Sequence, residues 1–205
     1  NGQNVALGTN LGTGTGTRNT GLGYNAMNSY SGSGFDNNTS VGYSNLVSLT
    51  SGSGNTSVGA EAMMALLTGT GNTGIGNQSL ISTTGSGNTA LGANAGGTNT
   101  TGSNNTLIGK SADVSSTALS NATAIGYNAS VDASNKIQLG NTSVTLVNTS
   151  GAITSGGAVT GTSIVKSGGT SSQFLKADGS VDATSYLVRE IADEASATCA
   201  ETSCR

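Results

Sequence analysis

The sequence contains no proline, tryptophan or histidine, and aromatic residues make up only 3% of its 205 positions. Charged residues are 8%, whereas an ordinary globular domain has about 25%. Disordered chains and collagen both require more proline than this, so neither class fits. Seven Lys and Arg against ten Asp and Glu leave no basic surface for nucleic acid. No apolar run approaches the roughly 18 residues that span a bilayer.

What the chain does contain is a repeat rich in glycine, serine, threonine and asparagine. These four residue types fill more than half of the sequence. The unit is Asn-Thr-small-aliphatic-Gly, it recurs about every 17 residues, and it covers residues 1 to about 145. The structural repeat glycines that close its nine copies are Gly8, Gly23, Gly42, Gly59, Gly76, Gly92, Gly109, Gly126 and Gly140.

Each position of the unit has a physical reason. The aliphatic residue and the β-branched residue two positions before it share one face of a strand. We expect this face to point inward or to a neighbour, and the small residue between them to meet solvent or a close neighbour. Glycine then permits a backbone turn, and asparagine tolerates left-handed geometry and can form stacked side-chain ladders.

A short strand, a glycine corner and a return of about twelve residues make one coil of a solenoid. The predicted fold is therefore an all-β repetitive β-solenoid or β-roll of about nine short coils stacked about 4.8 Å apart. In the returns, residues 43–49 and 60–67 could each form a helical turn, with Met63, Leu66 and Leu67 facing inward. Residues 93–103 indicate a loop.

The number of apolar residues per coil is low. Burying one aliphatic side chain is worth about 1.5–3 kcal/mol, whereas ordering the backbone costs about 1–2 kcal/mol per residue. Lateral packing of identical chains would bury a second face. The sequence therefore predicts a homotrimeric fibre.

Two segments carry a family resemblance. The runs NTALGANA at 88–95 and ATAIGYNAS at 122–130 resemble coils in the heads of trimeric autotransporter adhesins, which are trimers of left-handed parallel β-rolls. The longer cadence is similar to repeats in bacterial and phage fibre proteins, many of which end in an endosialidase-type chaperone. Residues 166–182, with Phe174, Leu175, Lys176 and Asp178, resemble a segment near the end of such fibres. No such chaperone follows here, so we expect the chain to be a fragment or a processed product.

Composition divides the chain into three segments. Residues 1–148 hold the repeats, and asparagine does not occur after Asn148. Residues 149–182 are predicted to be a slender β shaft and loop, with a turn at Asp178-Gly179. Apolar and polar residues alternate over 135–165, and Val144, Leu146, Ile153 and Ile164 are the candidate inward residues. Residues 183–205 have a helical pattern and contain Cys199 and Cys204. These cysteines are a candidate disulfide, within or between chains, or a free pair; without histidine they cannot complete a zinc site.

Catalytic, metal and cofactor sites have little support in the sequence. Residues 104–111 (NNTLIGKS) imitate a phosphate-binding loop, but Asn104 replaces its first glycine and Gly109 belongs to the repeat. Histidine, the usual general base, is absent. The repeat region has four acids, in different coils: Asp36, Glu61, Asp113 and Asp132. We therefore predict no enzyme, cofactor or metal.

The predicted function is a structural or adhesive fibre segment of a phage tail or a bacterial surface. It would be extracellular and would bind a surface glycan or protein receptor through multivalent contacts. A polysaccharide-degrading spike is one alternative, if a trimer brought acids together. An ice-binding solenoid is another, but it needs an outward threonine array, and the repeat threonine is expected to point inward or to a neighbour. Tyr24, Tyr43 and Tyr127 follow repeat glycines and could stack on sugars or cover neighbouring coils.

Overall fold

The structure of the chain is a computed structural model, and it describes residues 4–8, 16–28, 35–150, 174–175 and 181–182. The chain divides into two units, Asn1–Asn148 and Thr149–Arg205. The first unit contains all the repeat glycines, and it determines the architecture described below.

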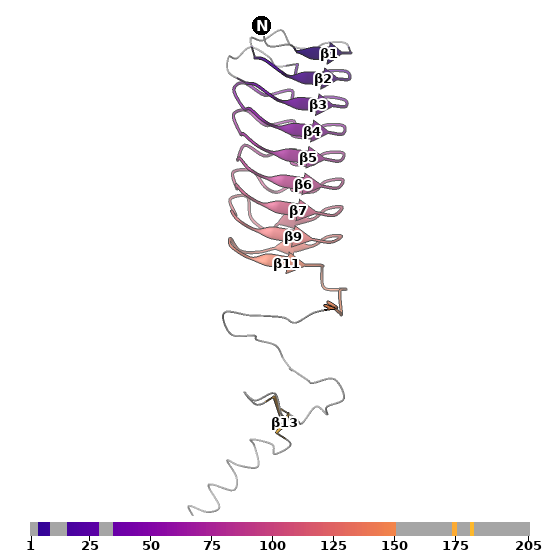
Figure 1. Ribbon diagram of the computed structural model, residues 1–205, viewed down its shortest axis with the longest axis vertical. Helices are drawn as coiled ribbons and strands as arrows, with labels where there is room; N and C mark the ends of the chain where they lie inside the picture. The colour runs from indigo at the N-terminus through magenta and orange to yellow at the C-terminus, as the bar shows by residue number, and fades with distance from the viewer. Residues whose placement is uncertain (1–3, 9–15, 29–34, 151–173, 176–180, 183–205) are drawn as a thin grey trace, which may run out of the picture. The chain divides into compact units, whose positions relative to one another are not determined.

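Nine short parallel strands form one sheet in the first unit, and each strand pairs with the next along the chain. Successive coils stack in a column (Figure 1). The described residues form a β-solenoid of about seven turns and contain no helix, including none that could cross a membrane. The strands are β1 (Val5–Leu7), β2 (Thr20–Leu22), β3 (Thr39–Val41), β4 (Thr56–Val58), β5 (Thr73–Ile75), β6 (Thr89–Leu91), β7 (Thr106–Ile108), β9 (Thr123–Ile125) and β11 (Ile137–Leu139).

The register of this sheet follows the repeat. Thr56 pairs with Thr73, Ser57 with Gly74, and Val58 with Ile75, and the same correspondence holds along the sheet. Equivalent residues therefore lie in columns parallel to the stack. The last two coils add a second parallel pair in the return, between β8 (Asp113–Val114) and β10 (Ser130–Val131).

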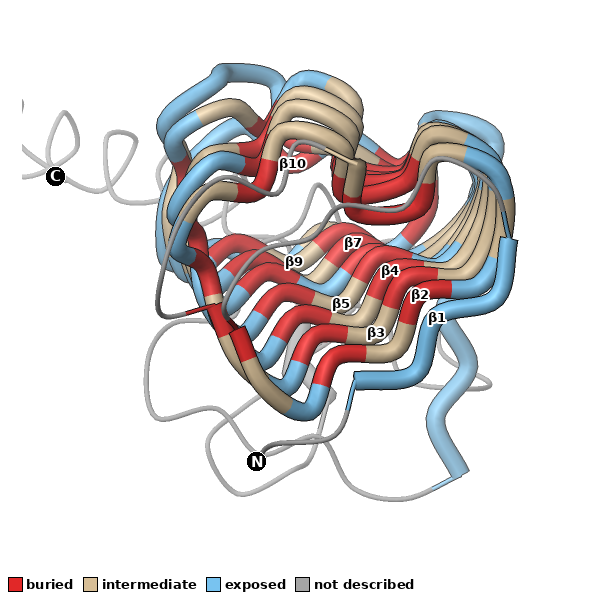
Figure 2. Tube along the Cα trace, turned by 90° about the horizontal axis from the view of Figure 1, so that it is seen from above, coloured by how far each residue is buried: buried red, intermediate tan, exposed pale blue. Residues whose placement is uncertain are grey.

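The strands turn the threonine and the aliphatic residue outward, so of the two directions expected for these residues, inward or toward a neighbour, the inward one is wrong. The middle residue of β2 to β7 and β9 is buried, whereas the threonine and the aliphatic residue on either side are half-buried or exposed. In the view down the stack, buried residues recur at the same place in β2 to β7 and β9 (Figure 2). The small middle residue faces the interior because the returns fill most of that space with larger side chains.

The returns supply the large core residues. Leu46, Met63 and Leu80 occupy equivalent positions in three successive coils, and all three are fully buried. Leu66 is also buried, as predicted for the residues of 60–67. Leu67, which we expected to point inward, is 46% exposed.

The two returns expected to contain helical turns contain none. Two residues in each return have a positive φ: 57° at Glu61 and 47° at Met63, and likewise Ser44 and Leu46. A continuous helix cannot form in such a backbone. Most of its amides bond between coils; the amide of Met63, for example, donates to the Ser79 carbonyl at 2.9 Å. The Leu66 amide, by contrast, donates to the Met63 carbonyl at 3.2 Å in a tight turn.

A column of buried asparagines joins the coils inside the solenoid. The Asn55 side chain accepts hydrogen bonds from the Asn72 amide (2.9 Å) and the Asn72 Nδ2 (3.2 Å). Its own Nδ2 donates to the Gly69 carbonyl at 2.9 Å. The same pattern recurs along the column, whose buried members are Asn19, Asn38, Asn55, Asn72, Asn88 and Asn105. The stacked side-chain ladder suggested by the sequence is therefore present.

The regular coil ends after β11. Val144 is 48% exposed and Leu146 75%, so the prediction that they point inward is wrong. In the second unit, β12 (Phe174–Leu175) pairs antiparallel with β13 (Val181–Asp182). The inward residues predicted at Ile153 and Ile164, the turn predicted at Asp178-Gly179, the helical segment 183–205, and Cys199 and Cys204 lie outside the described residues.

Candidate interaction surface

The outward side of the main sheet is the most extensive candidate surface. We call it the threonine–aliphatic face and define it as the two outward residues of each strand from β1 to β11. Seven strands begin with threonine, and all nine end with an aliphatic residue. The aliphatic column is Leu7, Leu22, Val41, Val58, Ile75, Leu91, Ile108, Ile125 and Leu139.

This face combines exposed apolar groups with an absence of charge. Leu22, Ile75, Leu91 and Ile125 are each between 38% and 47% exposed although coils cover them above and below. None of the residues in its nine strands is charged. At about 4.8 Å per strand, the face extends for roughly 38 Å. A continuous apolar stripe of this kind is typical of an interaction site.

The nine repeat glycines lie in a column at one edge of this face. The amide of Gly76 donates to the Val58 carbonyl at 2.8 Å, and equivalent bonds occur in the other coils. At Gly59, where φ is 134°, an added Cβ would collide with the carbonyl of Gly76 below. Glycine is therefore required because the coils approach closely and the backbone is left-handed there.

An edge column follows the glycines. We define it as the residue after each repeat glycine from β2 onward: Tyr24, Tyr43, Ala60, Asn77, Ala93, Lys110, Tyr127 and Asn141. The rings of Tyr24 and Tyr43 stack with centroids 5.7 Å apart and planes 9° from parallel. The pair nevertheless remains 51% and 52% exposed, and Tyr127 is 61% exposed. Contact with a neighbouring coil therefore buries only part of each tyrosine side chain.

Of the acids predicted to lie in different coils, Asp36 and Asp113 bond to the backbone. Asp36 accepts hydrogen bonds from the Thr17 amide (2.6 Å) and hydroxyl (3.0 Å), and these bonds lower the pKa of its carboxyl. Asp113 accepts from the Thr98 amide (2.9 Å) and the Val114 amide (2.8 Å). Burial dominates at Asp113 and raises its pKa despite those bonds.

The other two acids bond to side chains. Glu61 accepts a hydrogen bond from Gln78 at 2.8 Å, and Asp132 pairs with Lys136 at 2.7 Å. The Lys136 hydrogen bond lowers the pKa of Asp132. Each of the four carboxylates thus bonds to its own local partners. Such bonds stabilise the coils and turns in which the four residues lie.

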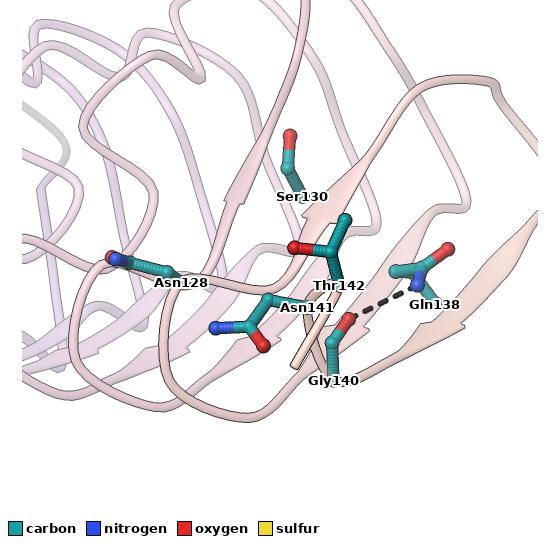
Figure 3. A pocket seen from close by; sticks show the side chains of 6 residues that line it. All are labelled: Asn128, Ser130, Gln138, Gly140, Asn141 and Thr142. Atoms are coloured by element: carbon teal, nitrogen blue, oxygen red, sulfur yellow. Dashed lines mark hydrogen bonds between the residues drawn. The ribbon is translucent and has the colours of Figure 1, made fainter. Parts of the chain in front are cut away.

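An open cavity of about 490 Å³ lies at the last coil. It is lined by Asn128, Ser130, Gln138, Gly140, Asn141 and Thr142, all uncharged (Figure 3). Gln138 pairs with Ala124, whose position faces the interior in the coils above, and its Nε2 donates to the Gly140 carbonyl at 3.0 Å. The cavity therefore marks the place where the stack ends with polar groups instead of another coil.

The remaining sequence motifs are part of the coil. Residues 104–111, which imitate a phosphate-binding loop, contain β7, the repeat glycine Gly109 and the exposed Lys110. Among the described residues, no group of three or more Cys, Asp or Glu side chains could hold a metal ion. The sequence left open whether the threonine–aliphatic face points inward or to a neighbour, and the packing of the returns turns it outward.

Comparisons with protein-family models, with curated proteins and with solved structures find no match.

Proposed function

We propose that this chain is a structural and adhesive fibre segment that assembles as a homotrimer through the threonine–aliphatic face. The observation that carries the proposal is the uncharged column of nine outward aliphatic residues, several of them about 40% exposed. A chain that stayed alone would leave this column in water. A second and third copy are the occupants that match it in length, spacing and lack of charge.

The energy of burial is at least of the same size as the cost of such an assembly. Fully burying an aliphatic side chain is worth about 1.5–3 kcal/mol, so covering a half-exposed one contributes about 1 kcal/mol. Nine per chain give roughly 30 kcal/mol for three chains by that estimate. Two association events cost about 4–15 kcal/mol each.

The narrowness of the face favours three chains over two broad sheets packed face to face. Each strand offers only two outward residues, so the outward surface of the sheet is a narrow strip two side chains wide. Three parallel chains around one axis bring their aliphatic columns together at that axis, with the threonines beside them. Because all coils rise by the same step, equivalent coils then meet level with one another. The resemblance of residues 88–95 and 122–130 to trimeric adhesin heads supports the same arrangement.

A parallel trimer also gives this chain a way to act that requires no catalytic cluster. Three identical outer surfaces repeat each weak contact, and avidity raises the overall affinity without any new contact. We place such a fibre outside the cell, on a phage tail or a bacterial surface.

Sedimentation equilibrium tests the assembly. We expect a mass of about three times the 19.8 kDa of one chain. Ile75→Asp should reduce it to one chain, because a carboxylate at the centre of the face would be buried without a partner. Ala118→Asp, at an exposed residue of a return, is the control and should leave the mass unchanged. A folded wild-type chain of 20 kDa at micromolar concentration would refute the trimer.

Ice binding is a second candidate, and the direction of the threonines favours it. The expectation that counted against it was a threonine that points inward or to a neighbour. The threonines of β2 to β7 and β9 lie in register on the outward side, which leaves them free for ice in a single chain. A monomeric chain that showed thermal hysteresis, with loss of this activity in Thr73→Tyr, would establish ice binding in place of the fibre. Nothing in the described residues favours the polysaccharide-degrading alternative.

A further inference from the structure

The edge column places exposed aromatic rings beside uncharged hydrogen-bonding groups, just past the glycine corner of the threonine–aliphatic face. Tyr24 and Tyr43 are the upper members, and they form the stacked pair. Both tyrosines follow strands whose register is fixed by pairing with their neighbours. The backbone that carries the two rings is therefore already ordered before a ligand binds. An ordered, half-exposed aromatic surface of this kind is suited to binding a ligand that has an apolar side.

The stack stops below Tyr43. The amide of Glu61 donates to the Tyr43 carbonyl at 2.8 Å, which places residues 60 and 61 in the coil directly beneath Tyr43. At this level the edge column has Ala60, and one methyl group cannot cover an aromatic ring. The lower face of the Tyr43 ring therefore has no aromatic partner, and the side chain is 52% exposed.

Hydrogen-bonding groups lie in the two coils below this ring, Glu61 in the first and Asn77 and Gln78 in the second. Gln78 donates through Nε2 to Oε2 of Glu61, and Asn77 donates through Nδ2 to the Ala60 carbonyl at 3.2 Å. These bonds orient both side chains and engage one carboxylate oxygen of Glu61. Oε1 of Glu61 and Oδ1 of Asn77 accept no hydrogen bond from the described residues, so both are available to an outside donor.

We propose that Tyr43, Ala60, Glu61 and Asn77 form a binding site for a neutral saccharide. A pyranose ring has one face of C–H groups, which would stack on Tyr43 above the small Ala60. Its hydroxyl groups would donate to Glu61 and Asn77. This inference rests on the proposed fibre function and gives it a receptor class.

The charges around the site disfavour acidic ligands of similar shape. An acidic sugar would meet the Glu61 carboxylate, and the nearest cation of the edge column is Lys110, three coils below Ala60 and roughly 14 Å away at about 4.8 Å per coil. A cationic ligand would also suit Tyr43 and Glu61, because the bond from Gln78 leaves the carboxylate its charge, and the polylysine probe below tests that alternative. Sugar hydroxyls both donate and accept, and so match the mixture of groups present.

A single open site of this kind is weak, with a dissociation constant on the order of 1 mM. Three copies in a fibre would raise the apparent affinity for a surface covered with the same glycan by avidity, by about 100-fold or more.

Glycan-array binding by the labelled full chain tests the proposal. The array should contain neutral oligosaccharides of hexoses, N-acetylhexosamines and deoxyhexoses, together with their sialylated and sulfated forms. We expect binding to neutral members only, with a loss of at least about tenfold in Tyr43→Ala. Tyr43→Phe keeps the ring and should retain most of the binding. Tyr127→Ala, in the same column but without Glu61 beside it, is the matched control and should bind as the wild type does.

The outcomes separate this inference from the fibre proposal. Three results with a trimeric wild type would overturn the saccharide site alone. They are no binding to neutral glycans, a preference for sialylated glycans or for a polylysine probe, and glycan binding by Tyr43→Ala that equals that of the wild type. A chain that is monomeric by sedimentation but shows Tyr43-dependent glycan binding overturns the trimer alone. Circular dichroism of each variant shows whether a loss of binding is due to unfolding. If Tyr43→Ala is unfolded, the glycan binding of Tyr43→Phe decides whether the saccharide site stands.

Discussion

At the residue scale, the middle residue of each strand is matched in size to the side chains of the return that lies opposite it. Gly74 lies opposite Met63, whose side chain would touch a Cβ added there at 3.3 Å. In a later coil the relation is reversed: Leu107 fills the strand position, and Gly96 of the return lies against it. Large and small residues thus alternate between strand and return. A small residue on one side of the interior is thus compensated by a large one on the other, and the aliphatic residues of the strands face outward.

The buried asparagine column gives the first prediction. Asn55→Ala removes the acceptor of the Asn72 amide and the donor to the Gly69 carbonyl, both of which are in the interior. Each unpaired buried group costs about 1–3 kcal/mol, so we expect a loss of about 3 kcal/mol or more in the free energy of unfolding. Urea denaturation measures it. Asn77→Ala is the control: Asn77 is exposed, and its loss should cost within about 0.5 kcal/mol. Equal losses in the two variants would contradict the role of the column.

Two aspartates predict opposite dependences of stability on pH. The folded pKa of Asp36 is lowered from 3.8, so its contribution to stability is present at neutral pH and is lost as pH falls through the folded pKa. The folded pKa of Asp113 is raised from 3.8, so its contribution is present at low pH and is lost as pH rises. As pH rises from 3 to 6, the Tm of Asp36→Asn should therefore fall relative to that of the wild type. Over the same range the Tm of Asp113→Asn should rise relative to that of the wild type. Thermal melts at both pH values measure this, and parallel curves for the two variants would contradict it.

At the element scale, two left-handed positions flank each strand in addition to those in the returns. The repeat glycine, such as Gly59, lies where a side chain would strike the next coil. The residue before each buried asparagine also has a positive φ, and at Gly71 it faces open space: nothing lies within 4 Å of a Cβ added there. Asparagine occupies the equivalent position in other coils, as at Asn104 with φ of 60°. The two positions therefore tolerate side chains differently.

The same substitution distinguishes them. Gly71→Asn should change the free energy of unfolding by less than about 1 kcal/mol, because asparagine adopts this conformation readily. Gly59→Asn should cost about 3 kcal/mol or more, because strain adds to a collision with the Gly76 carbonyl. Chemical denaturation of the two variants and the wild type measures the difference. Similar costs at the two positions would contradict the column of close contacts.

The sequence predicts this element well in one respect and poorly in another. The repeat gives the strand positions, the glycine column and the asparagine ladder, because each depends on a local residue type at a fixed spacing. It does not give the direction of the strands. Thr56 and Val58 share a face in either orientation, and only packing against Met63 and its neighbours determines which face is buried. The helical turn expected at residues 60–67 fails because bonds between coils replace bonds along the chain.

The saccharide site was only partly foreseeable for a similar reason. The sequence places Tyr24 and Tyr43 after repeat glycines, and thus in one column. It does not show that their rings stack or that Glu61 bonds to Gln78, since both facts depend on side chains 16 or more residues apart.

At the scale of the whole molecule, the solenoid is stable only to the extent that each coil is covered. Its inner column is small or polar in many coils, as at Ser40, Ser57 and Gly74, and much of its aliphatic surface lies outside. Packing of identical chains on the threonine–aliphatic face would turn that outer column into a second core. Stability and assembly would then be one process and would depend on protein concentration.

This coupling gives the final prediction. A chain whose folded state is an assembly gains stability by mass action, so its Tm should rise with protein concentration between about 1 and 100 μM. Leu91→Asp puts a charge in the middle of the aliphatic column, where it would be buried without a partner in the assembly. It should lower the Tm and remove most of the concentration dependence, because the variant can fold only as a single chain. Ala118→Asp adds the same charge away from the face and should keep the wild-type dependence. If the wild-type Tm stays constant over that range, the single chain is the stable unit, and the exposed aliphatic column needs another explanation.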